Sequence, residues 1–269
     1  MQNFDKIFKV KHPIIGMIHV QALSGTPKNK YSIDKIIAMA VSEAKIYKQC
    51  GIDAIMIENM HDVPYQKNNV GHEISTAMAL IAHLVKTTTN LPVGIQILAG
   101  ANKAALAVAK TANLDFVRVE GFVFGHVADE GYIDSQAAEI MRYRKQIDAE
   151  NIAVFTDIKK KHSSHAVTAD IDISEVAHAA EFFLSDAVIV TGKHTGSTAN
   201  TNEIKDVKKA TRLPVIIGSG VNYHNLEEYL HISDALIIGS YFKKDGYWEN
   251  ELDEDRISQF MKRKRELLK

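Results

Sequence analysis

The chain has 269 residues, a formal net charge of -1 and a single cysteine, Cys50. The near-neutral charge does not indicate a nucleic-acid or anionic-membrane partner. One cysteine excludes an intramolecular disulfide framework and a cysteine-based zinc site. No apolar run is long enough to span a bilayer, and the first residues lack the apolar core of a signal peptide, so we expect a cytoplasmic protein.

Short apolar runs alternate with segments of helical periodicity along the chain. The expected strands are 14–19, 53–58, 93–98, 115–120, 152–157 and 186–191, with two more inside 213–220 and 233–240. The expected helices are 32–49, 73–86, 101–112, 134–146, 174–183, 202–211, a segment between the last two strands, and 253–268. Asp134 and Ser174 are the expected N-caps of their helices, and Asn222 or Asn225 that of the helix after the seventh strand.

Strict alternation of strand and helix predicts a parallel sheet, and eight such units predict its closure into a barrel. The length is close to the roughly 250 residues that are usual for this architecture. The sequence therefore predicts an α/β fold, a single (β/α)8 TIM barrel over residues 1–269.

A weak repeat accompanies the strands. Every second strand begins with an aspartate, and three of the other strands follow a proline, at positions Asp53, Asp115, Asp186 and Asp234, and Pro13, Pro92 and Pro214. The amino-terminal rim of such a barrel serves stability, so we expect these aspartates to satisfy backbone groups there.

Polar residues gather at the other end of the predicted strands, whose interiors are otherwise almost wholly apolar. Active sites of TIM barrels lie at this carboxyl-terminal face, so the pattern predicts a functional site. The candidates for chemistry are His19, Glu58, Arg118, Asp157 and Lys159, and those for substrate contact are Asn59, Gln96, Glu120, His162 and Thr191.

Each of these candidates has a structural alternative. His19 is either a satisfied core histidine or an acid-base group. Glu58 and Asp157 need a cation, a metal ion or solvent, because carboxylates are rarely buried alone. Arg118 either bridges to one of these carboxylates or holds a substrate anion. Lys159 is expected to contact an anion, with a Schiff base as the alternative.

Metal and cofactor binding leave few signals. A divalent metal ion held by Glu58 and Asp157 is an alternative reading of the carboxylates, and no organic cofactor is implied. His162 and His165 have a spacing that metal ligands use, but no strong metal motif is complete around them.

Glycine-rich turns follow the last two expected strands. In a (β/α)8 barrel, the loops after strands 7 and 8 commonly hold a phosphate on backbone N–H groups. We therefore expect an anion site, to which the neighbouring strand and a lysine add, built from Gly192, Gly218, Ser219, Gly220, Gly239, Ser240 and Lys243.

Several of these segments resemble those of the BtpA/SgcQ family over nearly the whole chain. The resemblance is carried by the runs 16–19 with 23–27, 53–59, 115–119, 190–192 and 218–221. It implies a barrel of the ribulose-phosphate-binding type, and the family is named after a requirement in photosystem I biogenesis in cyanobacteria. Gln96 departs from the pattern, because similar proteins often carry asparagine there.

The sequence favours an enzyme acting on a small phosphorylated metabolite, a sugar or nucleoside phosphate. In this hypothesis His19 is an acid-base group and Glu58 or Asp157 is a general base or metal ligand. Arg118 or Lys159 stabilises an anionic intermediate. The reaction is that of an isomerase, lyase or hydrolase. Two alternatives are a non-catalytic assembly factor and a ligand-binding sensor, and a homo-oligomer stays open.

Overall fold

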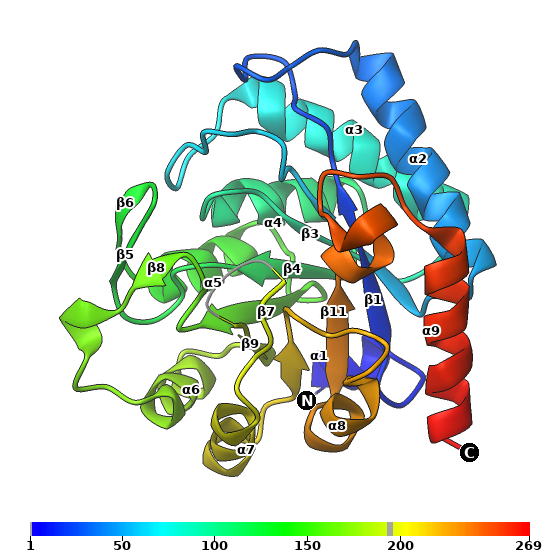
Figure 1. Cartoon of the computed structure of the whole chain (residues 1–269). Coiled ribbons are helices and arrows are strands. Elements are labelled where there is room, and N and C mark those ends of the chain that lie inside the picture. The colour runs from blue at the N-terminus through cyan, green and yellow to red at the C-terminus, as the bar shows by residue number, and fades with distance from the viewer. Residues whose placement is uncertain (1, 193–195) are drawn as a thin grey trace.

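Eight parallel strands close into a barrel, as predicted. The structure, a computed structural model, describes residues 2–192 and 196–269 (Figure 1). Around the barrel the strand order is β1-β11-β10-β9-β7-β4-β3-β2. The strands are β1 (Ile14–His19), β2 (Ala54–Glu58), β3 (Val93–Gln96), β4 (Phe116–Val119), β7 (Ala153–Ile158), β9 (Ala187–Val190), β10 (Val215–Ile217) and β11 (Ala235–Ile238).

Helices surround the barrel, and apolar residues of both layers pack between them. The helices are α1 (Gln2–Ile7), α2 (Ile33–Gln49), α3 (His72–Thr89), α4 (Asn102–Thr111), α5 (Ala137–Gln146), α6 (Ile173–Phe182), α7 (Thr201–Ala210), α8 (Leu226–Ile232) and α9 (Glu254–Leu267). None of the helices in the described ranges is long and apolar enough to cross a membrane.

Aromatic residues close the amino-terminal end of the barrel. The sequence did not predict helix α1, which brings Phe4 against Phe155 with ring centroids 5.9 Å apart. Phe8, just after this helix, lies 5.9 Å from Phe116. All four rings are buried. This end is therefore filled, and the cavities of the site lie at the other end.

The four aspartates at the amino-terminal rim do what the repeat predicts. Each accepts a hydrogen bond from a backbone N–H of the preceding strand of its pair. The distances are 2.7 Å for Asp53 and Ile14, 2.7 Å for Asp115 and Val93, 2.8 Å for Asp186 and Val154, and 2.7 Å for Asp234 and Val215.

Each rim aspartate also forms an ion pair with a lysine or arginine side chain. This cation comes from the helix that follows the preceding pair of strands around the barrel. The pairs are Lys264 of α9 with Asp53, Lys86 of α3 with Asp115, Arg144 of α5 with Asp186, and Lys208 of α7 with Asp234. We call each set of aspartate, strand N–H and cation a rim joint. The four rim joints tie successive quarters of the barrel to one another.

The long loops at the carboxyl-terminal face hold structure that the sequence did not predict. The glycine-rich loop after β4 forms strands β5 (His126–Ala128) and β6 (Gly131–Ile133), which pair with β8 (Ser163–Ser164) in an antiparallel sheet. Short 3-10 turns are η1 (Ala166–Thr168), η2 (Ser240–Phe242) and η3 (Lys244–Gly246).

The expected N-cap residues of two helices were wrong. A third residue occupies the N-cap position but does not make the capping hydrogen bond. Helix α5 begins at Ala137, and Asp134 instead accepts from the N–H of Ser135. Helix α6 is capped by Asp172 rather than Ser174, because a reciprocal capping box with Glu175 satisfies two backbone donors there. Asn225 is the N-cap of α8 but makes no side-chain cap bond, since its Oδ1 accepts from the N–H of Asn222.

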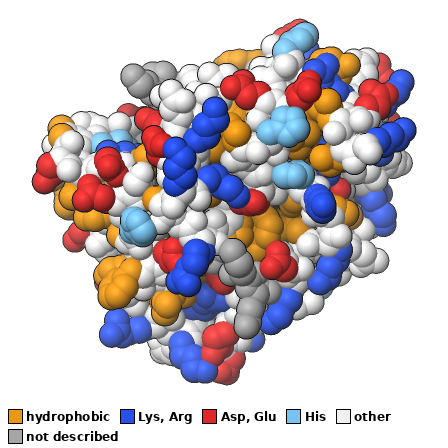
Figure 2. All heavy atoms as spheres, turned by 90° about the horizontal axis from the view of Figure 1, so that it is seen from below, with side chains coloured by type: hydrophobic (Ala, Val, Ile, Leu, Met, Phe, Trp, Pro, Cys, Tyr) orange, Lys and Arg blue, Asp and Glu red, His pale blue; other side chains and the backbone are white. Residues whose placement is uncertain are grey.

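The molecular surface has mixed charge. On the face shown in Figure 2, lysine, arginine and carboxylate side chains are interspersed, without a broad field of positive charge. This face agrees with the net charge of -1.

Candidate active site

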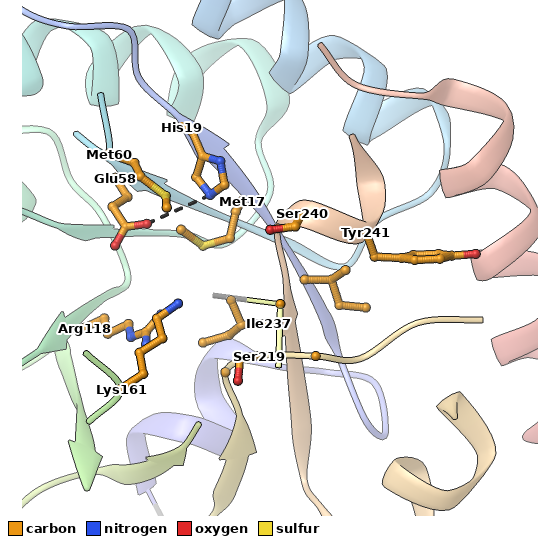
Figure 3. A pocket seen from close by; sticks show the side chains of 15 residues that line it. Met17, His19, Glu58, Met60, Arg118, Lys161, Ser219, Ile237, Ser240 and Tyr241 are labelled. Atoms are coloured by element: carbon orange, nitrogen blue, oxygen red, sulfur yellow. Dashed lines mark ion pairs between the residues drawn. The ribbon is translucent and has the colours of Figure 1, made fainter. Parts of the chain in front are cut away.

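Two adjoining cavities open at the carboxyl-terminal ends of the strands. The first, here the anion chamber, has about 500 Å³ of empty space. Figure 3 shows its opposing walls, with Arg118 and Lys161 on one side and the turns at Ser219 and Ser240 on another. His19 and Glu58 form a third wall, and the Tyr241 ring points away.

His19 and Glu58 form a buried pair, and burial favours the neutral form of each side chain. Burial, reinforced by Lys243, lowers the pKa of His19 to about 3, so its ring is neutral near pH 7. His19 Nδ1 lies 3.2 Å from the Trp248 carbonyl oxygen, which only accepts, so Nδ1 carries the proton and Nε2 is free to accept one. Glu58 Oε2 lies 4.0 Å from Nε2. Burial raises the pKa of Glu58, although Arg118 and Lys161 oppose the shift.

Arg118 forms a bidentate ion pair with Asp157 across the strand ends of β4 and β7. Its Nε and Nη2 donate to the two carboxylate oxygens at 3.0 and 2.9 Å. Burial alone would lower the pKa of Arg118, but Asp157 and Glu58 raise it above its ordinary value. The ion pair is the structural bridge that the sequence offered as one alternative. Arg118 nevertheless lines both cavities, so a ligand can contact it as well.

Lys161 takes the position that the sequence assigned to Lys159. The backbone of Lys159 has a φ of 46°, and its Nζ donates to the Ile171 carbonyl oxygen, outside both cavities. Lys161 instead lines both and lies beside Arg118 (Figure 3). Burial and the Arg118 charge lower the pKa of Lys161, while Glu58 opposes this. Lys161 therefore replaces Lys159 as the lysine candidate.

The glycine turns after β10 and β11 lie where the sequence predicts them, on the wall of the anion chamber. Gly220 has a φ of 73°, and a Cβ there would lie 2.4 Å from the Ser197 carbonyl oxygen. A Cβ at Gly239 would lie 3.1 Å from His19 Nε2. Both positions therefore favour glycine, which brings backbone close to the chamber. Gly218, Ser219 and Ser240 complete this wall.

Two predicted anion contacts are used inside the protein. The Gly192 N–H donates to Ser219 Oγ at 2.6 Å, and this hydroxyl donates to the Ser197 carbonyl oxygen. Lys243 is only 1% exposed, and its Nζ donates to Glu43 of α2 at 2.6 Å. Neither Gly192 nor Lys243 lines the anion chamber in the described structure.

The second cavity, here the head-group chamber, adjoins the first and has about 780 Å³ of empty space. It shares Glu58, Arg118, Lys161 and Met60 with the anion chamber. Its other lining residues come from the end of β3 and from the loops that follow β2, β3, β4, β7 and β11. They are Tyr65, Gln96, Leu98, Glu120, Asp129, Glu130, Lys160, His162 and Trp248.

The remaining predicted contacts divide between the cavities and the framework. Gln96 and Glu120 face the head-group chamber, as does the exposed His162. Asn59 supports the loop after β2, since its Nδ2 donates to Asp62 and its Oδ1 accepts from the Leu98 N–H. Thr191 Oγ1 accepts from the Lys161 N–H at 3.2 Å and so holds the lysine loop.

Metal ligands are not grouped in the part of the chain that the structure describes. No set of three or more histidine, cysteine or carboxylate residues there is placed to hold a metal ion. Both oxygens of Asp157 accept from Arg118. The alternative in which Glu58 and Asp157 hold a metal therefore has no support from the described geometry.

Sequence reasoning missed several lining residues because they come from loops. Trp248, the only tryptophan in the chain, follows η3, and its carbonyl oxygen orients His19. Lys160 Nζ lies 3.1 Å from Glu120 Oε2. Glu130, in the turn between β5 and β6, also lines the head-group chamber. A lone tryptophan after the last strand was the one signal available.

Solved structures with the same fold include enzymes of phosphorylated compounds. (S)-3-O-geranylgeranylglyceryl phosphate synthase from Thermoplasma acidophilum, in complex with its substrate sn-glycerol-1-phosphate, superposes with a TM-score of 0.60. The identity is 15%, and the match covers 97% of this chain and 96% of the synthase. At this identity the match establishes the fold and not the reaction.

Sequence relatives cover almost the whole chain. An uncharacterised protein of Caenorhabditis elegans, named as mitochondrial, is 50% identical over 96% of this chain and 95% of its own length. The photosystem I biogenesis protein BtpA of Synechocystis is 29% identical over 97% of this chain and 91% of its own length. The model of the BtpA family matches residues 10–266. The resemblance seen in the strand-end motifs is thus confirmed, and the chain belongs to the BtpA family.

Proposed function

We propose that this protein is an enzyme that moves a proton on a small phosphorylated metabolite, as an isomerase or lyase does. One observation carries the proposal. The His19–Glu58 pair and two basic side chains, Arg118 and Lys161, face the same chamber as two glycine turns. An assembly surface has no need of buried acid-base groups around a cavity.

The anion chamber supports binding of the phosphate group. Backbone at the Gly218–Gly220 and Gly239–Ser240 turns approaches the chamber closely, and Lys161 and Arg118 supply positive charge from the opposite side. Turns of this kind at the last two strands of a TIM barrel commonly bind phosphate. The Thermoplasma synthase, which shares the fold, is named with a phosphorylated substrate.

The chemistry follows from the protonation states. His19 Nε2 is an unprotonated acceptor at the chamber wall and acts as the base. The proton that His19 takes up passes to Glu58, whose Oε2 lies 4.0 Å from Nε2 and whose pKa burial raises, and Glu58 delivers it to the adjoining carbon as the acid. Arg118 stays charged and stabilises the enolate-like anion that proton removal from a carbon next to a carbonyl creates.

Solvent exchange tests this function across many candidate substrates. The protein is incubated in D2O with a panel of phosphorylated ketoses, aldoses and keto acids, and NMR follows loss of the carbon-bound proton. We expect exchange with at least one compound and none with the His19→Asn variant. Absence of exchange across the panel, together with no phosphate-induced rise in Tm, would refute the proposal.

A non-catalytic assembly role is the second candidate, because a BtpA protein of Synechocystis named for photosystem I biogenesis is a relative. If this role applies, a variant carrying both His19→Asn and Glu58→Gln complements a deletion strain fully. The enzyme proposal expects the double variant to fail.

Location and assembly are parts of the proposal as well. We propose a cytoplasmic enzyme, whereas the nematode relative is named as mitochondrial. Cell fractionation decides the location, and light scattering of the purified protein decides whether it forms a homo-oligomer.

A further inference from the structure

The head-group chamber contains buried hydrogen-bond acceptors that lack partners. Gln96 Oε1 and Glu130 Oε2 are both buried atoms, and neither has a hydrogen-bond partner among the described residues. Both residues line this chamber. Burying an acceptor without a donor costs about 1–3 kcal/mol, so such atoms in a cavity point to a ligand that brings donors.

The orientation of the Gln96 amide follows from its neighbour. Gln96 Nε2 donates to Glu120 Oε1 at 3.0 Å, and Lys160 Nζ donates to Glu120 Oε2 at 3.1 Å. Burial alone would raise the pKa of Glu120, but Lys160 and Arg118 hold it below its usual range, so the carboxylate is ionised. An ionised carboxylate only accepts, so the amide nitrogen must face Glu120 and Oε1 is left for another donor.

Gln96 is held firmly in this position. The side chain is 2% exposed and lies at the end of β3, so the barrel fixes its direction. Glu130 reaches the same chamber from the β5–β6 turn. One acceptor therefore comes from the barrel and one from the small antiparallel sheet above it.

The other walls suit a flat ring. Tyr65, Leu98, Met60 and Trp248 supply aromatic and aliphatic surface beside the polar groups. Small-molecule sites combine such apolar walls with a few convergent polar groups that fix orientation. A short phosphorylated chain that fits the anion chamber alone would leave these walls and both acceptors unused.

We propose that the head-group chamber is the subsite for an amino-bearing ring, so that the substrate is a phosphorylated sugar that carries both this ring and the carbonyl needed for the proposed proton transfer, and nucleoside monophosphates serve as binding probes for it. This inference rests on the proposed function, because the phosphate must occupy the adjoining anion chamber. An exocyclic amino group donates to Gln96 Oε1 and Glu130 Oε2, and the ring lies against the aromatic and aliphatic walls. Glu58 and Lys161, shared by both chambers, then lie at the sugar between the two ends.

Isothermal titration calorimetry with matched probes tests the inference. The probes are inorganic phosphate, ribose 5-phosphate, the amino-bearing AMP, GMP and CMP, and the partners IMP and UMP, which lack the amino group. We expect at least one amino-bearing nucleotide to bind about tenfold or more tightly than ribose 5-phosphate, and more tightly than its partner.

Two variants test whether Gln96 and Glu130 cause the preference for an amino-bearing nucleotide. Gln96→Leu and Glu130→Ala each remove one acceptor and are expected to weaken the preferred nucleotide about tenfold while leaving ribose 5-phosphate within about twofold. Glu139→Ala, at an exposed position of α5, is the matched control and should change neither affinity. If Gln96→Leu fails to fold, Glu130→Ala decides, because Glu130 lies in a partly exposed turn.

The outcomes distinguish failure of this inference from failure of the proposed function on which it rests. If phosphate or ribose 5-phosphate binds but no nucleotide binds more tightly, the inference is wrong and the proposed function stands. If a nucleotide preference exists but survives both substitutions, the inference is also wrong. If none of the probes binds, the anion chamber is no phosphate site, and both the proposed function and the inference fail.

Discussion

Lys159 and Lys161 show where the alternation of side-chain direction along a strand ceases to hold. Both share the parity of Asp157, which predicts that all three face the barrel mouth. The left-handed backbone of Lys159 breaks the alternation just after β7, so its side chain binds the Ile171 carbonyl oxygen while Lys161 lines the cavities. Alternation holds inside strands and fails where the ladder ends.

The lysine pair gives a matched test at this scale. Lys161→Met removes a cation from the anion chamber, whereas Lys159→Met removes one outside it. We expect the rise in Tm caused by inorganic phosphate to disappear in Lys161→Met and to persist in Lys159→Met, as measured by thermal unfolding. An equal loss in both variants would mean that Lys161 does not contact the anion.

His19 gives a second prediction, in the pH dependence of turnover. With its pKa lowered to about 3 by burial, His19 stays an unprotonated base above that pH, so kcat/KM should show no loss attributable to this group between pH 7 and pH 5. His19→Asn should lower kcat by about 10²–10⁴-fold. A fall in kcat/KM centred near the ordinary histidine pKa, absent in a variant with altered His19, would contradict the assignment.

The elements of the barrel were predictable because each carries its own local signal. Apolar runs gave the strands, and helical periodicity gave the outer helices. The strand pairs with a leading aspartate predicted hydrogen bonds at the rim, which the Asp53 and Asp115 contacts confirm. The cations of the rim joints come from distant helices, so no local pattern reveals them. Strands β5, β6 and β8 were not predicted either, because they are short and are stabilised by pairing with one another.

A rim joint can be tested by removing its centre. Asp53→Ala leaves Lys264, which is 5% exposed, without its carboxylate, and leaves the Ile14 N–H without an acceptor. We expect urea unfolding to show a loss of about 3 kcal/mol. Asp53→Asn keeps an acceptor for the N–H and should cost less. Equal losses would show that the hydrogen bond to the Ile14 N–H contributes nothing and that the lost lysine contact accounts for the whole effect.

At the scale of the whole molecule, the sequence predicted the barrel and the end of it at which the candidate site lies, but not the second cavity. Strand ends converge on one face by topology, so residues such as Glu58 and Arg118 could be placed together. The head-group chamber is bounded by loops, and the contributions of Trp248 and Glu130 depend on how those loops fold back over the barrel. Long-range loop contacts leave no periodic trace in a sequence.

Buried His126 makes global stability depend on pH. Burial, with Lys160 and His165, lowers its pKa to about 4 from the ordinary 6.5. Between these two values the unfolded chain binds a proton that the folded protein does not, so this contribution to stability falls as the pH falls. The difference in unfolding free energy between the wild type and His126→Asn should therefore shrink by about 1.2 kcal/mol from pH 6 to pH 5. The exposed His83→Asn variant is the control, and a constant difference for His126→Asn would contradict the burial argument.

The rim joints also imply an order of events during folding. The cations of three joints precede their aspartates by less than a fifth of the chain, as Lys86 and Asp115 illustrate with a separation of 29 residues. The fourth joins Lys264 to Asp53 across 211 residues. Closing a longer loop costs more chain entropy, and distant contacts form late. The first three joints can therefore form as each quarter assembles, and the fourth marks the moment at which the ring closes.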